Sequence, residues 1–175
     1  QDFNRALELN PNLFQAYRAR GLAHAAEGRP GQAVEDLSRA MELAPTQSEL
    51  YADRGAAYLG SGQFEQAAAD FSEVLRDDPN NVSTLRMRGE ALARLSRYDA
   101  AVDDFTKAIA LEPNNAMIFY GRARALAGLG KNEEAVEDYD RAILLAPDLA
   151  AAYAGRGQAQ HRLGRWEQAA ADLDR

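Results

Sequence analysis

The chain has 175 residues, and its 27 acidic side chains outnumber its 20 lysines and arginines, which gives a formal charge of −7. A nucleic-acid-binding surface needs a basic face, so this balance argues against a nucleic-acid partner. The sequence has no cysteine and no apolar run near the roughly 20 residues that span a bilayer, which argues against disulfides, cysteine-based metal sites and membrane insertion.

Five prolines recur at a constant interval of 34 residues, at Pro11, Pro45, Pro79, Pro113 and Pro147. A period of this length indicates that one structural unit is copied head to tail. We expect a single repeat array over 1–175. Its expected repeats are a partial one at 1–13, full ones at 14–47, 48–81, 82–115 and 116–149, and a truncated one at 150–175.

Aligning the copies gives columns of only small residues and columns of large apolar residues. The small columns are Ala33, Ala67, Ala101, Ala135 and Ala169, then Ala23, Ala57, Ala91, Ala125 and Ala159, then Gly21, Gly55, Gly89, Ala123 and Gly157. The large columns are Tyr17, Tyr51, Leu85, Phe119 and Tyr153, and Phe3, Leu37, Phe71, Phe105, Tyr139 and Leu173. Small residues opposite large ones predict two closely packed helices in each copy.

Each copy is therefore expected to contain a helix A followed by an antiparallel helix B. Helix A is expected near 15–27, 49–61, 83–95, 117–129 and 151–163, and helix B near 1–9, 31–43, 65–77, 99–111, 133–145 and 167–175. A residue able to adopt the left-handed conformation should end each helix A. The candidates are Gly28, Gly62, Ser96, Gly130 and Gly164, in which the serine departs from the glycine pattern.

This pattern resembles the tetratricopeptide repeat family over essentially the whole chain. The resemblance rests on the aromatic column in helix A, the small column, the Ala33 column, the Phe71 column and the closing proline. It implies an all-α fold, a right-handed superhelical solenoid of antiparallel helix pairs. In the family, the free face of helix A lines a concave groove that binds protein segments.

One regular column departs from the family, because an arginine occupies a helix A position where leucine is more common. An aspartate follows each arginine by 16 residues, and the pairs are Arg20 and Asp36, Arg54 and Asp70, Arg88 and Asp104, Arg122 and Asp138, and Arg156 and Asp172. We interpret them as a structural ion-pair ladder. The spacing allows each pair to form within a repeat, or across the seam between repeats as between Arg20 and Asp2.

The free face of helix A carries more arginine than acid, although the whole chain is acidic. Its predicted peptide-binding residues are Arg86, Met87, Glu90, Arg94, Met117, Tyr120, Arg124, His161 and Arg162. Arginine suits carboxylate recognition and methionine offers an adaptable apolar contact, so an acidic peptide is a candidate ligand. Glu90 lies four residues from both Arg86 and Arg94, which leaves open that this face neutralises itself.

Two known binding modes of the family lack their residues here. The carboxylate clamp uses lysine, asparagine and arginine at fixed positions. In this sequence those positions hold Arg18, Leu22, Asp53, Ser83 and Met87. The positions of the asparagine ladder hold Ala19, Asp53, Met87, Gly121 and Gly155. Neither function is therefore expected.

No motif for catalysis, a metal or a cofactor is present. The two histidines, His24 and His161, lie in different repeats with no cysteine or organised serine beside them. His24 stands where Tyr58 and Leu92 stand in the next copies, which predicts a packed side chain. We expect no enzyme activity, no cofactor and no metal site.

The chain begins inside a helix B and stops before a closing proline, so the sequence is interpreted as a fragment of a longer array. The predicted function is a non-catalytic scaffold that binds a peptide segment or helix of a partner protein. One alternative is the substrate-recruiting arm of a larger multidomain enzyme. Another is self-association through the truncated ends, and the sequence leaves the cellular compartment open.

Overall fold

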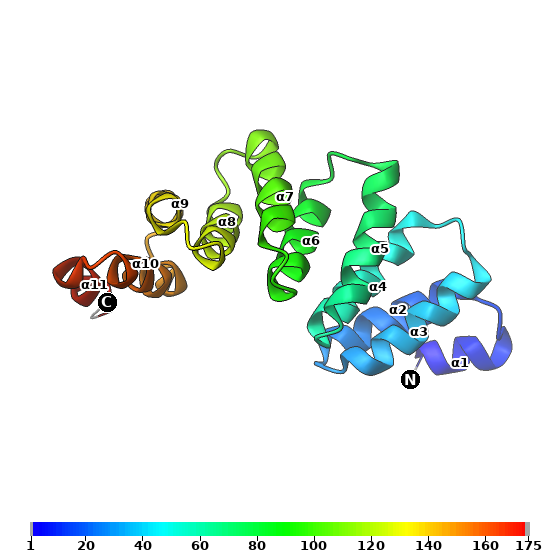
Figure 1. Cartoon of the computed structure of the whole chain (residues 1–175). Helices are drawn as coiled ribbons and strands as arrows, with labels where there is room; N and C mark the ends of the chain where they lie inside the picture. The colour runs from blue at the N-terminus through cyan, green and yellow to red at the C-terminus, as the bar shows by residue number, and fades with distance from the viewer. Residues whose placement is uncertain (1, 174–175) are drawn as a thin grey trace. The chain divides into compact units, whose positions relative to one another are not determined.

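The computed structural model describes residues 2–173, and every regular element in this part is an α-helix (Figure 1). Helix A elements are α2 (Phe14–Ala26), α4 (Ser48–Gly60), α6 (Val82–Arg94), α8 (Ala116–Gly128) and α10 (Ala150–Arg162). Helix B elements are α1 (Asp2–Leu9), α3 (Pro30–Leu43), α5 (Phe64–Asp77), α7 (Tyr98–Leu111), α9 (Asn132–Leu145) and α11 (Trp166–Leu173). The all-α, helix-pair architecture expected from the sequence is confirmed.

The helix bounds lie close to the expected ones. Each helix A begins and ends one residue before its expected range, and α3, α5, α7 and α9 begin one residue earlier than expected. The expected extension of the last helix to residue 175, and the core role of the Leu173 side chain, lie outside what the structure describes. No helix of residues 2–173 has the length and apolarity required to cross a bilayer.

The chain divides into two compact units, Gln1–Met87 and Arg88–Arg175, with the division inside α6. In the first unit α2 packs on α3, α3 on α4, and α4 on α5. In the second unit α7 packs on α8, α8 on α9, α9 on α10, and α10 on α11. Within each unit, successive helices are thus neighbours in space.

The small column marks the points where helices A and B of one repeat cross. A Cβ atom added to Gly21 would lie 2.9 Å from Leu37 Cγ, and one added to Gly55 would lie 2.7 Å from the Phe71 ring. Both distances are shorter than carbon atoms tolerate, so a side chain at either position would push the two helices apart.

The alanine columns and the large helix B column form the core. Ala33, Ala67, Ala101 and Ala135 are fully buried, and Leu37, Phe71, Phe105 and Tyr139 are each at most 3% exposed. Two positions differ from the expectation. Ala23 is only half-buried because it lines an open pocket beside α1, and Phe3 is 40% exposed.

The turn that ends α6 uses a serine in the left-handed conformation. Ser96 has φ 59°, while the four glycines of this column have φ between 72° and 78°. The Arg97 N–H bonds the Leu92 carbonyl at 2.9 Å and the Ser96 N–H bonds the Ala93 carbonyl at 3.1 Å, which is a Schellman ending. The hydrogen bonds of the turn therefore require positive φ even where the residue has a Cβ atom.

We expect Ser96→Gly to raise the free energy of unfolding by about 1 kcal/mol, because glycine adopts this conformation without steric cost. Urea unfolding measures the change. Ser83→Gly is the matched control, since Ser83 is an exposed serine inside α6 and glycine there should destabilise by about 0.5–1 kcal/mol. A lower unfolding midpoint for Ser96→Gly would contradict the assignment of strain to this position.

Candidate functional site

The arginine and aspartate columns meet as bidentate ion pairs inside each repeat. In the first full repeat, Arg20 Nε and Nη2 lie 2.8 and 2.6 Å from the two carboxylate oxygens of Asp36. The other four pairs have the same geometry, with N to O distances between 2.5 and 2.8 Å. The aspartates are 5–7% exposed, and their hydrogen bonds raise the pKa of the ladder arginines against the opposing effect of burial.

Ladder arginines also reach back across the seam to the preceding helix B. Arg20 Nη1 donates to Asn4 Oδ1 at 2.7 Å, not to Asp2. The same arm of Arg54, Arg122 and Arg156 donates to Ser38, Thr106 and Asp140. Of the two arrangements left open by the sequence, the pairing within the repeat occurs, and the seam contact of Arg20 is made to Asn4 in place of Asp2. One guanidinium thus joins three helices.

The residues that receive this second arm form a column that the sequence analysis missed. Positions 4, 38, 106 and 140 hold Asn, Ser, Thr and Asp, all short polar side chains. Their identity varies, but their size and hydrogen-bonding capacity do not. A search for conserved chemistry at the 34-residue interval, and not for identical residues, would have found them.

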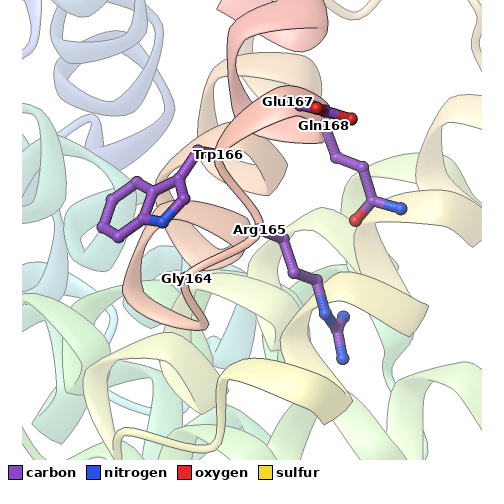
Figure 2. A pocket seen from close by; sticks show the side chains of 5 residues that line it. All are labelled: Gly164, Arg165, Trp166, Glu167 and Gln168. Carbon is purple, nitrogen blue, oxygen red and sulfur yellow. The ribbon is translucent and has the colours of Figure 1, made fainter.

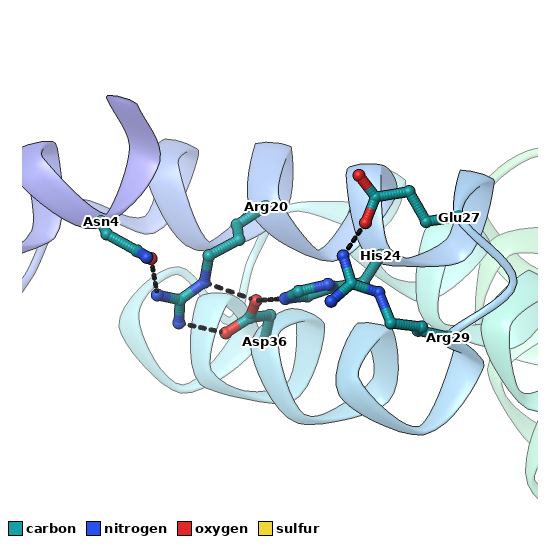
Figure 3. A network of polar contacts seen from close by, with 6 residues as sticks. All are labelled: Asn4, Arg20, His24, Glu27, Arg29 and Asp36. Atoms are coloured by element: carbon teal, nitrogen blue, oxygen red, sulfur yellow. Dashed lines mark hydrogen bonds and ion pairs between the residues drawn. The ribbon is translucent and has the colours of Figure 1, made fainter. Parts of the chain in front are cut away.

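His24 lies beside the first ladder pair, where Figure 3 shows its ring between Asp36 and Arg29. Its Nε2 is 3.6 Å from Asp36 Oδ2, and its buried Nδ1 has no hydrogen-bond partner in the described part of the chain. Glu27 pairs with Arg29 at the mouth of an adjoining polar pocket of about 520 Å³. Residues 2–173 contain no cluster of three histidine, aspartate or glutamate side chains that could hold a metal.

The helix A face of the first unit neutralises its own positive charge. Arg18 Nε lies 2.6 Å from Asp53 Oδ2, and Arg18 Nη1 lies 2.6 Å from Glu49 Oε2. Both acids belong to α4 and the arginine to α2, so these contacts join successive A helices. A pocket of about 330 Å³ adjoins them, and Leu22 on its wall is 41% exposed.

Two arginines on the helix A face of the second unit, Arg124 of α8 and Arg162 of α10, lack such compensation. Neither α8 nor α10 contains an aspartate or glutamate. Arg124 lies over the ring of Tyr120 at 5.6 Å, and Arg162 Nη1 donates to the Ala127 carbonyl at 3.1 Å. Within the described residues, neither guanidinium contacts a carboxylate.

Tyr139 of α9 projects to the seam where α8 and α10 meet. Its ring centroid is 6.1 Å from that of Tyr120, and a Cβ atom added to Gly155 would lie 2.6 Å from its hydroxyl oxygen. Burial, together with Tyr120, raises the pKa of Tyr139 to about 12, while Arg124 and Arg162 act to lower it. Both arginines therefore act electrostatically on this hydroxyl.

Glycine at 155 and at 121 is explained by these aromatic rings. A Cβ atom at Gly121 would lie 2.5 Å from the Phe105 ring, just as one at Gly155 would meet Tyr139. The sequence analysis treated both glycines only as departures from the asparagine column. A large helix B residue followed 16 residues later by glycine was the available signal.

The other predicted groove residues are distributed along helix A elements. Arg86 and Met87 end the first unit, and Glu90 and Arg94 follow them on α6 in the second. Met117 is 47% exposed on α8. Tyr120, Arg124 and Arg162 are brought together around Tyr139, whereas Arg86 and Met87 belong to the other unit.

His161 contacts Trp166 edge-on, with ring centroids 4.6 Å apart. Figure 2 shows Trp166 and Arg165 at the turn into α11, beside a pocket of about 460 Å³. Trp166 is 61% exposed and was not among the predicted site residues. It was visible in the sequence as the only tryptophan of the chain.

Comparison with protein families agrees with the repeat. A family model described as "Tetratricopeptide repeat" matches residues 1–48 and 53–116, and further repeat models match 105–137 and 123–164. The chain belongs to the tetratricopeptide repeat family. A search of curated proteins gave no significant match.

Solved structures with the same fold include several MamA proteins. MamA 41-end from Desulfovibrio magneticus RS-1 is 22% identical with a TM-score of 0.84, covering 92% of this chain and 91% of that one. MamA AMB-1 is 26% identical with a TM-score of 0.78, covering 90% and 94%. MamA MSR-1 is 24% identical with a TM-score of 0.78, covering 92% of each chain.

The ladder predicts different costs for two neighbouring arginines of α6. Arg88→Ala should destabilise by about 2–3 kcal/mol, because it leaves the buried carboxylate of Asp104 without its ion pair. Arg86→Ala removes a half-buried arginine outside the ladder and should change stability by about 0.5 kcal/mol at most. Urea unfolding compares the two, and equal midpoints would show that the ladder contributes no more than solvated surface pairs.

The raised pKa of Tyr139 predicts a dependence of stability on alkaline pH. An unfolded tyrosine ionises near pH 10 and Tyr139 in the folded chain near 12, so its contribution is complete below pH 10 and is lost between 10 and 12. Tyr139→Phe should reduce this loss by about 2–3 kcal/mol. Unfolding free energies measured from pH 8 to 12 provide the test, and identical pH profiles for both proteins would refute it.

Proposed function

We propose that the chain is a non-catalytic scaffold that binds a peptide segment or helix of a partner protein on its helix A faces. Membership of the tetratricopeptide repeat family and the likeness to the MamA fold support a protein-binding role. The helix A face supports the finer proposal, because helix B residues fill the core while side chains such as Met117 and Arg124 stay exposed.

The observation that carries this proposal is the uncompensated positive charge of Arg124 on α8 and Arg162 on α10. The chain as a whole has seven more acids than bases, yet these two helices contain no acid at all. In the first unit, by contrast, Glu49 and Asp53 form ion pairs with Arg18 and neutralise its charge. A basic face that the protein does not neutralise itself suits an acidic partner segment.

Apolar side chains next to this charge would supply the remaining contacts. Met117 is exposed on α8, and the half-buried ring of Tyr120 lies one helical turn before Arg124. Interface anchors are commonly aromatic or methionine side chains beside arginine. The expected ligand therefore combines acidic residues with one or two apolar ones.

The test is the binding of a pool of 12-residue acidic peptides, each carrying one leucine or phenylalanine, measured by fluorescence anisotropy at low and moderate salt. Arg124→Glu with Arg162→Glu should lower the affinity at least about tenfold, because charged hydrogen bonds contribute about 1.5–3 kcal/mol each. The salt dependence of binding should also fall.

Lys107→Glu with Lys131→Glu is the matched control. It makes the same change in net charge within the second unit, on exposed helix B and turn positions away from α8 and α10. Equal losses in both double variants would indicate general charge attraction, and unchanged binding in the arginine variant would place recognition on another face.

A further inference from the structure

We propose that the seam between α8 and α10 is a carboxylate subsite, in which the Tyr139 hydroxyl and the Arg124 and Arg162 guanidiniums receive one Asp or Glu side chain of the bound peptide. This inference rests on the proposed function and deepens it. It assigns the preference for acidic peptides to the seam between α8 and α10, and it gives Tyr139 of helix B a role in recognition.

The hydroxyl of Tyr139 is the first observation. The side chain is 3% exposed, and its hydroxyl makes no hydrogen bond within the described residues. The hydroxyl oxygen is not among the fully enclosed side-chain polar atoms that lack a partner in the described residues, so solvent and a ligand can reach it. The core thus retains a hydrogen-bond donor that stability alone does not require, since phenylalanine fills this column at 71 and 105.

The position of the hydroxyl is the second observation. It lies against Gly155 of α10, where a Cβ atom would be only 2.6 Å away, and the Tyr139 ring lies beside Tyr120 of α8. The absent side chain at 155 is what allows the hydroxyl to reach this seam. A donor is therefore presented between two A helices that contain no acid.

The two guanidiniums are the third observation. Arg162 is held over the C-terminal end of α8 by its hydrogen bond to the Ala127 carbonyl, and Arg124 is held over the Tyr120 ring. Each retains further N–H groups, since a guanidinium has five. An anion at the Tyr139 hydroxyl would be attracted by both.

The first unit shows which anion this register accepts. Asp53 of α4 occupies the register position of Gly155, three repeats earlier, and its carboxylate is bound by Arg18 of the preceding helix A at 2.6 Å. In the second unit the glycine at this position has no side chain, and Arg124 of α8 and Arg162 of α10 contact no carboxylate within the described residues. A peptide carboxylate would therefore occupy the place that Asp53 fills internally, and this favours a carboxylate over a phosphate.

The probe is an acetylated, amidated hexaglutamate peptide, with hexaglutamine as its neutral counterpart, titrated against the full chain at low salt. Tyr139→Phe should weaken hexaglutamate binding about tenfold, the worth of one hydrogen bond to a charged group, and leave hexaglutamine binding unchanged. Arg162→Gln should weaken hexaglutamate binding at least as much. The controls are Tyr58→Phe in the first unit and Arg165→Gln at the exposed turn, which should bind like the wild type.

Stability supplies a second readout that a purely structural tyrosine would not give. Because the hydroxyl has no hydrogen-bond partner among residues 2–173, Tyr139→Phe should leave the urea midpoint at pH 7 unchanged or raise it. Lower affinity together with equal or higher stability is the expected combination. A fall in both would assign the hydroxyl to folding and overturn the proposal.

The remaining outcomes separate this inference from the function on which it rests. Loss of binding in Arg162→Gln, with none in Tyr139→Phe, would overturn the subsite and leave a general basic face. Tighter, Tyr139-dependent binding of a hexaphosphoserine peptide would overturn the choice of carboxylate. Failure of hexaglutamate to bind, while peptides of the acidic pool do bind, would overturn the subsite alone, and failure of both would overturn the proposed function as well.

Discussion

The insertion of one large helix B side chain between two A helices is the constraint on which the rest of the structure depends. Phe105 of α7 contacts α6 at Gly89 and α8 at Gly121; a Cβ atom would lie 3.0 Å from the ring at Gly89 and 2.5 Å at Gly121. This contact sets the spacing of successive A helices. It also turns the opposite face of each A helix away from the core, which keeps Met117 and Arg124 exposed.

The arginine ladder depends on the same spacing. A guanidinium on helix A reaches its own helix B and the preceding helix B only if all three helices keep constant separations, as Arg122 does with Asp138 and Thr106. The buried aspartates make the ladder costly to break and therefore specific. It also commits half of the helix A arginines to structure, which distinguishes them from an arginine outside the ladder such as Arg124.

The two units show how one register can be used in opposite ways. In the first unit Asp53 closes the seam between A helices with an internal ion pair to Arg18. In the second, glycine at 155 admits the hydroxyl of Tyr139, and the arginines beside it have no acid. The same register thus carries an internal ion pair in the first unit and, in the described part of the second unit, two arginines that contact no carboxylate.

The sequence by itself determined the helices, their order and their core faces, because a 34-residue period repeats each local preference and each small-against-large contact five times. Even Ser96 could be placed at its turn, since the hydrogen bonds that end α6 require its conformation. Only the tertiary structure decided which groups meet across helices. Examples are the contact of Arg20 Nη1 with Asn4 and the electrostatic effect of Arg162 on Tyr139. Both depend on side-chain lengths and on the distances between helices whose residues are 16 or more positions apart in the sequence. A residue pattern does not contain those distances.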